Sequence, residues 1–338
     1  MIDHPNDHTP GGWRSWHDDS VRLRLGLSSC LLGDEVRYNG GHSKNAFVVD
    51  VLGRWFEWVP VCPEVEIGMG TPRPIVRLEA GGDGDARMVC PSTGVDFTRR
   101  MKSYSLKRVR ELRREGLDGY IFKRGSPSCG MERVKVWGAR KIERRDGVGL
   151  FADALTDRWP TLPVEEEGRL DDSAVRENFI ERVFCRNRWR SLAGRGLTRR
   201  RLVAFHAAHE MLLRSHNEAG YRRMGRIVDR AAGAGRIKDS ELFILYENEL
   251  TAVMRTRATV KKHRNVLGLA MGCLERALDP AGKREILTAI ADYSAGLLPL
   301  VVPLTLLRFN IRRHGVEHLA NQLYFDPHPK ELMLRNHV

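Results

Sequence analysis

The chain has 338 residues, of which 42% are hydrophobic and 29% are charged, a composition that is typical of folded proteins and excludes a disordered chain. The first twenty residues lack the apolar run of a signal peptide, and the longest apolar run, residues 295–307, contains two prolines and is too short to cross a bilayer. We therefore expect a cytoplasmic protein without membrane association, whose six cysteines stay reduced instead of forming a disulfide framework.

The formal net charge is +13, and the positive charge is concentrated in one region. Residues 181–230 contain thirteen arginines and four acidic residues. This density is typical of proteins that bind a polyanion such as nucleic acid, although a solvated helix surface in an arginine-rich proteome would give the same pattern.

The first half of the chain alternates strands with helices, which is typical of a parallel sheet with crossover helices. In chain order we predict a strand over residues 21–27, a helix over 45–58, a strand ending in a turn over 58–68, a small hairpin over 87–98, a long basic helix over 98–115, and a strand with a turn over 116–130. A linker over residues 157–170 follows. Five segments with helical apolar spacing come after it, over residues 172–189, 198–216, 240–256, 259–278 and 281–298.

These elements predict two domains behind a disordered tail. The tail covers residues 1–20, an α/β domain with a mainly parallel sheet covers residues 21–162, and an all-α helical domain covers residues 163–338. Ser240 and Thr259 are expected to cap helices, and Pro280 suits the first turn of the helix that it opens.

Three of the six cysteines, Cys30, Cys62 and Cys129, share one setting. Each lies just past a predicted strand, beside a turn of Gly, Pro or Ser, and parallel strands end at the same edge of a sheet. Three converging thiolates suit zinc with one further ligand, or an iron–sulfur cluster with one open iron; ordinary buried cysteines are the alternative. Cys90 falls in the hairpin, and Cys185 and Cys273 fall on apolar helix faces, where we expect buried structural cysteines.

Three sequence blocks resemble the signature of the thiouracil desulfidase (TudS-like) family. The blocks are "SSCLLGDEVRYNGGHSKN", "VPVCPEVEIGMGTPRPIVRL" and "KRGSPSCG", and the resemblance covers roughly residues 21 to 160. It implies that Cys30, Cys62 and Cys129 hold a 4Fe-4S cluster whose fourth iron is not bound by protein. The chain has "GMGTPRP" where the family resemblance leads us to expect a glycine-glycine-leucine run.

The second half resembles the YbgA-type helical domain. The stretches that carry this resemblance are "FHAAHEMLL", "VKKHRNVLGLAMG" and "LPLVVPLTLLRFNIRRHG". A fusion of the two modules is similar to bacterial desulfidases that act on 4-thiouridine in transfer RNA. The resemblance therefore implies that the partner is transfer RNA or a thiolated nucleobase.

The implied reaction is a hydrolysis without net electron transfer. The open iron would bind the thiocarbonyl sulfur as a Lewis acid, water would attack the ring carbon, and sulfide would leave. Glu64, two residues after Cys62, is the predicted general base, with a helix-capping carboxylate as the alternative. Ser126 is predicted to hydrogen-bond the ring or to pass a proton, with Ser128 as its alternative, and a turn-forming serine would explain either one.

Further polar residues near the blocks are predicted to bind the substrate or to tune the cluster. These residues are Ser28, Ser29, Asn39, His42, Lys44 and Ser128. In the helical domain we predict phosphate contacts from two basic stretches. Their residues are Arg222, Arg223, Arg226, Lys261, Lys262 and Arg264.

The stretch "HAAHE" is a second candidate metal site, in the helical domain. His206 and Glu210 are four residues apart and share a helix face, with His209 beside them. The pattern lacks the pair of histidines at i and i+4 that zinc proteases use. Histidines satisfied within the helical domain, or RNA phosphate contacts, are the favoured interpretations.

Two functions from different classes follow. The first is an iron–sulfur desulfidase for thiouracil-type bases, acting on transfer RNA or on the free base. The second is a non-catalytic nucleic-acid-binding protein whose N-terminal cysteines hold structural zinc.

Overall fold

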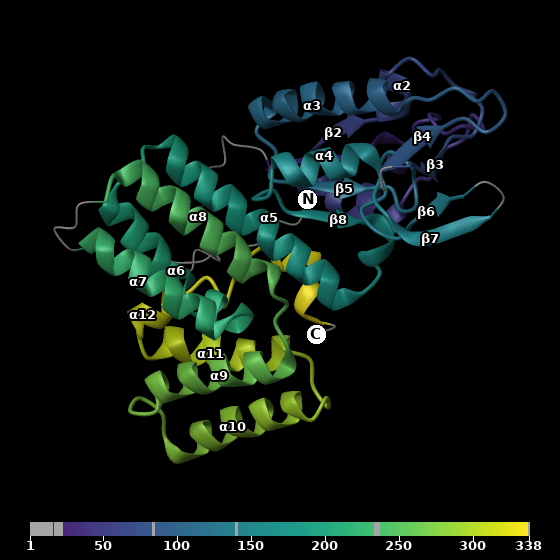
Figure 1. The fold of residues 1–338 in the computed structure, drawn as a ribbon. Helices are drawn as coiled ribbons and strands as arrows, with labels where there is room; N and C mark the ends of the chain where they lie inside the picture. The colour runs from purple at the N-terminus through teal and green to yellow at the C-terminus, as the bar shows by residue number, and fades with distance from the viewer. Residues whose placement is uncertain (1–15, 17–22, 83–84, 139–140, 233–236, 337–338) are drawn as a thin grey trace. The chain divides into compact units, whose positions relative to one another are not determined.

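The computed structural model describes residues 16, 23–82, 85–138, 141–232 and 237–336 (Figure 1). The chain divides into two compact units, an α/β unit formed by residues 22–171 and a helical unit that contains the residues from Asp172 onward. This confirms the predicted fold class. The predicted tail, residues 1–20, lies outside the described residues except for Trp16.

The division between the units falls later than the predicted boundary after residue 162. Strand β8 (Val164–Glu166) pairs in parallel with β5 (Gly119–Phe122), so this segment belongs to the sheet of the α/β unit. Along the chain, the boundary between the two units falls between Asp171 and Asp172. No helix in the described part of the chain is both long enough and apolar enough to cross a bilayer.

Two four-stranded sheets form the α/β unit. The other strands are β1 (Leu23–Ser28), β2 (Phe56–Val61), β3 (Arg77–Ala80), β4 (Ala86–Val89), β6 (Val134–Trp137) and β7 (Ile142–Gly147). In the first sheet the order is β2-β1-β5-β8 and every pair is parallel. In the second the order is β4-β3-β6-β7, where only the central pair is parallel. The sequence predicted the parallel sheet but not β3, β6 and β7 of the mixed one.

β1 is a central strand of the parallel sheet, as its apolar sequence indicates. Every residue of the strand except Arg24 is buried, because both faces of such a sheet are covered. At Gly26 a Cβ atom would lie 2.4 Å from the ring of Tyr120 on β5, so the two strands pack with no room for a side chain. This tight packing fixes where the carboxyl end of β1 lies.

Three α-helices are found among the described residues of the α/β unit: α2 (Pro63–Glu66), α3 (Thr98–Glu115) and α4 (Leu150–Arg158). α3 has the bounds that the sequence predicts. Asp96 Oδ1 accepts the amide hydrogen of Thr98 at 2.8 Å, and Gly116 ends the helix with a left-handed φ of 73°. Its buried residues recur every three or four positions and form one packed stripe: Met101, Ser105, Val109 and Leu112.

The helix predicted over residues 45–58 is wrong in its extent. Phe47–Val51 form a π-helical turn, Leu52–Arg54 form a 3-10 turn, and β2 begins at Phe56. Because β2 pairs with β1 along its whole length, its backbone groups are satisfied in the sheet, and this tertiary pairing overrides the local helical spacing.

The helical unit contains α5 (Ser173–Gly194), α6 (Arg199–His216), α7 (Glu218–Ala232), α8 (Asp239–Arg255), α9 (Val260–Leu274), α10 (Pro280–Ser294), α11 (Val301–Arg313) and α12 (Glu317–Ala320). The five predicted helices correspond to α5, α6, α8, α9 and α10. Thr259 caps α9 by accepting the Lys262 amide hydrogen, and Pro280 opens α10, as predicted. Ser240 is not a cap, because Asp239 already lies inside α8.

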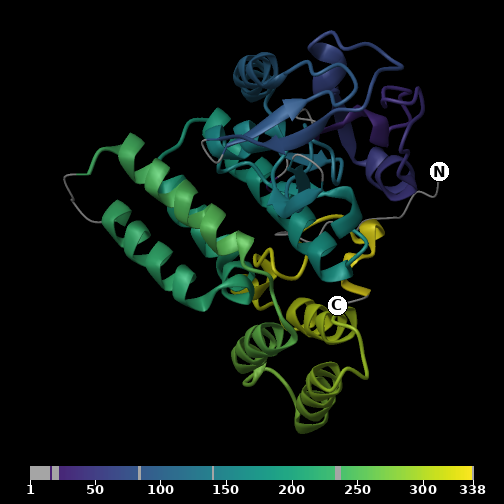
Figure 2. The same ribbon diagram turned by 45° about the vertical axis from the view of Figure 1, so that its right-hand side comes forward.

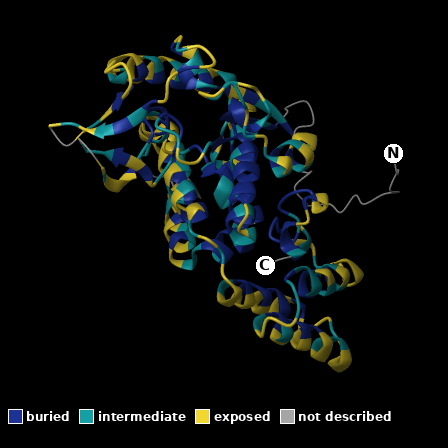
Figure 3. Ribbon diagram, turned by 90° about the vertical axis from the view of Figure 1, so that its right-hand side faces the viewer, coloured by how far each residue is buried: buried dark blue, intermediate teal, exposed yellow. Residues whose placement is uncertain are grey.

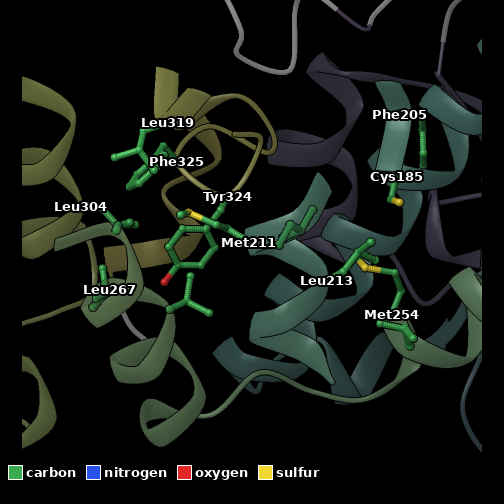
Figure 4. Close-up of a cluster of buried hydrophobic side chains, with 14 of the residues drawn as sticks. Cys185, Phe205, Met211, Leu213, Met254, Leu267, Leu304, Leu319, Tyr324 and Phe325 are labelled. Carbon is green, nitrogen blue, oxygen red and sulfur yellow. The ribbon is translucent and has the colours of Figure 1, made fainter. Parts of the chain in front are cut away.

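One apolar core runs through the helical unit. α9, α10 and α11 pack on one another and are seen nearly end-on in Figure 2. The exposed residues of these helices lie on the faces that point away from their neighbours (Figure 3). Tyr324 follows α12 and lies in this core with Leu267, Leu304 and Phe325 (Figure 4). The C-terminal segment is therefore part of the fold of this unit.

Candidate active site

Three cysteines lie at the carboxyl-terminal edge of the parallel sheet. Cys30 belongs to the 3-10 turn η1 (Ser29–Leu31) that follows β1, Cys62 directly follows β2, and Cys129 lies in the turn after β5. All three line one cleft of about 440 Å³. Neighbouring parallel strands end at the same edge, so the sheet topology brings together thiols that are far apart in the sequence.

The side chain of Ser126 and the close approach of Gly149 hold the turn that carries Cys129. Ser126 Oγ accepts the amide hydrogens of Ser128 at 3.2 Å and of Cys129 at 3.1 Å. Gly149 packs directly on this turn, because a Cβ atom there would lie 2.5 Å from the carbonyl carbon of Ser128. Ser126 therefore has the turn-forming role that the sequence allowed, and the backbone at Cys129 is fixed.

Burial raises the pKa of all three thiols. It raises the pKa of Cys30 to about 11, against the opposing charge of Lys123, and it also raises the pKa values of Cys62 and Cys129. The charge of Cys62 contributes to the pKa shifts at both other cysteines, so Cys62 lies within electrostatic reach of each of them. Binding of a metal would have to displace these protons, which couples metal binding to pH.

Glu64 lines the same cleft, and both of its carboxylate oxygens are engaged. Oε2 accepts hydrogen bonds from Arg73 Nε at 2.9 Å and Nη2 at 2.6 Å. Oε1 accepts the hydroxyl hydrogen of Ser128 at 2.7 Å, whereas the hydroxyl of Ser126 lies 3.5 Å away. The pair is nearly buried, since the Arg73 side chain is 3% exposed and that of Glu64 is 11% exposed. Glu64 and Ser128 thus form a hydrogen-bonded pair that can move a proton.

Glu64 does not cap the helix that follows it. The N-cap of α2 is Cys62, and its amide hydrogen is accepted by Glu66 Oε1 at 3.1 Å. Glu66 Oε2 in turn accepts the hydroxyl of Tyr104 at 2.7 Å. The capping role considered for Glu64 therefore belongs to Glu66.

The spacing of the thiols suits a cluster better than a single metal ion. In the described part of the chain, three potential ligand atoms lie within 4.8 Å of one another only in a Glu/Glu/His group of the helical unit, so the three sulfur atoms are spread more widely. One zinc ion with bonds of about 2.3 Å would hold its sulfurs roughly 3.8 Å apart. An iron–sulfur cluster places several iron and sulfide atoms between its thiolates, so it accommodates the wider spacing.

The two serines that precede Cys30 also line the cleft. Ser28 Oγ accepts the amide hydrogen of Lys123 at 2.9 Å and so joins the ends of β1 and β5. The hydroxyl of Ser29 is buried and has no hydrogen-bond partner among the described residues. The free hydroxyl of Ser29 could donate a hydrogen bond to a sulfur atom of a bound cluster.

The structure places Asn39, His42 and Lys44 outside the cleft. All three are exposed; Asn39 Oδ1 accepts the Gly41 amide hydrogen at 3.2 Å, and His42 Nδ1 accepts that of Lys44 at 3.2 Å. They shape their own loop instead of facing the thiols. The same loop brings two neighbouring residues, at positions 37 and 38, to the cleft in their place.

Cations in the cleft are the main feature that the sequence prediction missed. The cationic side chains that line it are Arg37, Arg73, Lys123, Arg124 and Lys135. Against them stands one acidic lining residue, Glu64. Arg73 also donates to the carbonyl oxygens of Val36 at 2.8 Å and Gly70 at 2.9 Å, which ties two loops to the site. The sequence signal was the "GMGTPRP" stretch, which departs from the expected run and contains Arg73.

The histidines of "HAAHE" are satisfied within the helical unit. His209 Nε2 lies 3.1 Å from Arg188 Nε and its Nδ1 lies 2.7 Å from the carbonyl oxygen of Phe205, so neither ring nitrogen is free to bind a metal. His206 Nδ1 lies 3.1 Å from the hydroxyl of Tyr246. Glu210 forms an ion pair with an arginine one turn along the helix. These contacts support the interpretation that the histidines are satisfied within the helical unit, and they leave no ring nitrogen of His209 free for the second candidate metal site.

The six predicted RNA contacts fall into two groups. Arg222 and Arg223 on α7 form ion pairs with glutamates, and Lys262 donates to the carbonyl oxygens of His216 and Arg257 at 2.7 and 2.8 Å. The other three are exposed, and no ion pair is seen for them in the described part of the unit: Arg226, Lys261 and Arg264.

The remaining cysteines lie away from the cleft lining. Cys185 is buried, as predicted, and Cys90 of the predicted hairpin is buried as well. Cys273 is exposed, which corrects the prediction that it lies on a buried helix face. α9 buries Met271 and Leu274, whereas Gly272 and Cys273 between them are exposed, so the helix is as predicted but Cys273 lies outside its buried stripe.

Comparison with known proteins identifies both units. The model of a family described as 2-thiouracil desulfurase matches residues 25–167, and that of a protein family of unknown function (DUF1722) matches residues 210–329. The uncharacterized protein YbbK of Bacillus subtilis (strain 168) is 32% identical over 109 residues, which are 31% of this chain and 71% of YbbK. The chain therefore belongs to the 2-thiouracil desulfurase family.

Two further matches are a curated bacterial protein and a solved structure. The uncharacterized protein YbgA of Escherichia coli (strain K12) is 24% identical over 168 residues, which are 50% of this chain and 95% of YbgA. The solved structure of a 4Fe-4S-dependent thiouracil desulfidase, TudS, is 28% identical, with a TM-score of 0.36, and the match covers 44% of this chain and 94% of that one.

Proposed function

We propose that this protein is an iron–sulfur-dependent desulfidase that removes sulfur from thiouracil-type bases, with 4-thiouridine in transfer RNA as its substrate. The observation that carries the proposal is one cleft that contains three cysteines together with the Glu64–Ser128 pair. The family to which the chain belongs is described by the same substrate class, 2-thiouracil.

Cys30, Cys62 and Cys129 would hold a 4Fe-4S cluster through three of its irons. When bound, the cluster supplies an iron with an open position, a Lewis acid for the thiocarbonyl sulfur. The overall exchange is balanced without a redox partner, because the ring carbon loses sulfide and gains the oxygen of one water molecule.

The side chains of the cleft supply the proton transfers. Glu64 is the base for the attacking water, and Arg73 balances the carboxylate charge from the opposite oxygen. We place the proton relay on Ser128, because its hydroxyl lies 2.7 Å from Glu64 Oε1 and that of Ser126 lies 3.5 Å away. Ser126 instead holds the turn that carries Cys129.

Removal of single cysteines tests the cluster. Alanine variants of Cys30, Cys62 and Cys129 should contain little iron after anaerobic reconstitution and should not desulfurate free 2-thiouracil. Cys90→Ala and Cys273→Ala are the matched controls and should keep their iron, brown colour and activity. A ligand variant that keeps full iron would contradict the assignment, and a colourless wild-type protein that contains zinc would support the structural-zinc alternative.

Charge removal in the helical unit tests the transfer RNA half of the proposal. The exposed residues Arg226, Lys261 and Arg264 are the best targets, because ion pairs or carbonyl contacts already engage the other predicted residues. The triple alanine variant should bind transfer RNA more weakly, with a salt slope reduced by roughly 0.9 per lost duplex contact. Turnover of free 2-thiouracil should stay unchanged. Equal loss of both activities would mean that the triple variant damages the enzyme as a whole.

A further inference from the structure

The helical unit contains a second cavity, of about 340 Å³, that the proposed chemistry does not use. Its lining comes from the first half of α5, the last residue of α6, the loop before α9 and the first turn of α9, and the end of α10. This volume lies in the range of sites for small molecules. The cavity lies within the helical unit and is separate from the cleft of the α/β unit.

A buried ionic network forms one wall of this cavity. Arg335 donates to Oε1 of Glu177 at 3.0 Å and to Oε1 of Glu181 at 2.9 Å. His216 Nε2 lies 3.0 Å from Glu181 Oε2, and His216 Nδ1 lies 2.8 Å from the carbonyl oxygen of Thr256. The guanidinium already bridges the two carboxylates, so the network does not offer them to a metal ion. Glu177, Glu181 and His216 line the cavity, which therefore has fixed polar groups at its wall.

Tyr293 is the feature of the cavity that the fold by itself does not explain. The residue is 2% exposed, it lines the cavity, and its hydroxyl has no hydrogen-bond partner among the described residues. Tyr246 is buried in the same unit, but its hydroxyl is paired with His206. A buried hydroxyl without a partner destabilises a fold. A ligand in the cavity would satisfy it.

The mouth of the cavity favours an anion. Thr259 and Val260, at the N-terminus of the 15-residue helix α9, line it together with the exposed Arg257. Amide hydrogens and the helix dipole make such a terminus attractive to phosphate, and Arg257 adds a full positive charge. At the start of α5 the Asp172 carboxylate accepts two amide hydrogens and adds a negative charge, whereas at the start of α9 the neutral hydroxyl of Thr259 accepts only one, that of Lys262.

The interior favours an uncharged group with hydrogen-bonding edges. His263 lines the cavity, and burial lowers its pKa to about 3, so it stays neutral. Its Nδ1 lies 3.0 Å from the hydroxyl of Tyr324, and its ring meets that of Tyr293 edge to face. Aromatic rings and neutral hydrogen-bonding groups are the partners that proteins use for an unstacked base.

We propose that this cavity binds one nucleotide of the RNA substrate, with its phosphate at the N-terminus of α9 beside Arg257 and its base inside against the hydroxyl of Tyr293. The inference rests on the proposed function, because it assumes that the protein binds RNA. It assigns to the helical unit a pocket for a single turned-out nucleotide, in addition to a charged surface.

Two matched tyrosine variants test the inference in the full-length protein. Tyr293→Phe removes only the unpartnered hydroxyl, so the melting temperature should not fall, while affinity for an unmodified transfer RNA transcript should weaken about 3- to 10-fold. Tyr246→Phe removes a hydroxyl that is paired within the protein, so it should lower the melting temperature and leave RNA affinity unchanged. Fluorescence anisotropy with labelled transfer RNA and thermal melts would measure the two effects.

A charge variant, Arg257→Ala, tests the phosphate position at the mouth of the cavity. Arg257→Ala should also weaken transfer RNA binding and should reduce the salt slope by about one contact, whereas Tyr293→Phe should leave that slope unchanged. Uridine monophosphate is the second probe, and it should compete with transfer RNA in the wild-type protein. If Tyr293→Phe weakens only the binding of free uridine monophosphate, the assignment to RNA is overturned.

The outcomes separate this inference from the proposed function. Desulfuration of free 2-thiouracil should be unchanged in both cavity variants. If the wild-type protein binds transfer RNA and neither Tyr293→Phe nor Arg257→Ala weakens it, the inference is overturned and the proposed function stands. If the wild-type protein does not bind transfer RNA, the RNA half of the proposed function fails and this inference fails with it.

Discussion

Each unit buries carboxylates against an arginine, but the two arrangements differ in how the chain builds them. In the α/β unit, Glu64 and Arg73 are nine residues apart and lie beside the sheet edge. In the helical unit, Arg335 reaches back across 158 residues to Glu177 and across 154 residues to Glu181. The first pair belongs to one local segment, while the second joins the C-terminal segment to α5. The sequence predicted neither ion pair, local or distant, because each forms through contacts that only the folded chain makes.

The two arrangements also differ in what surrounds the charge. Around Glu64, a proton-bearing serine and three thiols share a cleft, so the carboxylate has partners for chemistry. Around Arg335, the neighbouring groups are engaged with one another, and Tyr293 is left without a partner beside the cavity. We therefore expect substitutions at the first pair to change rates and those at the second to change stability.

The largest expected effect is on catalysis at Glu64. Glu64→Gln removes the base but no cluster ligand, so turnover of 2-thiouracil should fall about 10²- to 10⁴-fold with iron content retained. Iron analysis and steady-state kinetics on the same preparation check this. An iron-free variant would mean that Glu64 is structural, and a fully active one would place the base elsewhere.

The second effect is on the stability of the helical unit. Arg335→Met leaves two buried carboxylates without their cation and should reduce the free energy of unfolding by about 3–5 kcal/mol. Arg264→Met, at an exposed position of the same unit, should change it by less than about 0.5 kcal/mol. Chemical denaturation followed by circular dichroism measures both. Equal stability of the two variants would contradict the network as a structural element.

A third effect separates the two serines of the cleft. Ser128→Ala removes the hydroxyl next to Glu64 and should lower turnover about tenfold, the effect of one hydrogen bond lost in the transition state. Ser126→Ala should instead weaken the turn that carries Cys129, so cluster retention should fall on exposure to a chelator. If Ser126→Ala loses turnover and Ser128→Ala does not, the relay belongs to Ser126.

The smallest effect is a pH dependence at His209. Burial, with the charge of Arg188, holds the pKa of this histidine well below 6.5, so the unfolded chain binds a proton that the folded chain excludes. Its contribution to stability is complete above pH 6.5 and is lost as the pH falls below that value, by about 1.4 kcal/mol per pH unit. Unfolding of the wild type and of His209→Gln at pH 7.5 and 5.5 should show this difference in slope, and parallel slopes would contradict it.

The sequence predicted the cleft because its residues follow strands. The apolar run of β1 and the turns after β2 and β5 place Cys30, Cys62 and Cys129 at strand ends. The parallel pairing of β1 with β2 and β5 then brings these strand ends to the same edge of the sheet. α3 was predicted to the residue because Asp96, which accepts the Thr98 amide hydrogen, the apolar stripe and Gly116 are all local signals. Where the local signal conflicted with sheet pairing, as over residues 45–58, pairing with β1 decided the structure.

By itself, the sequence determined the fold class, the three convergent thiols and the carboxylate beside them, since each depends on periodicity or on nearness to a strand end. Only the tertiary structure decided that Arg73 balances Glu64, that Ser128 and not Ser126 is its close partner, and that the helical unit has a cavity with an unpaired tyrosine hydroxyl. Hydrogen bonds depend on distances of a few tenths of an ångström, and burial depends on every neighbour. Neither is encoded in spacing along the chain.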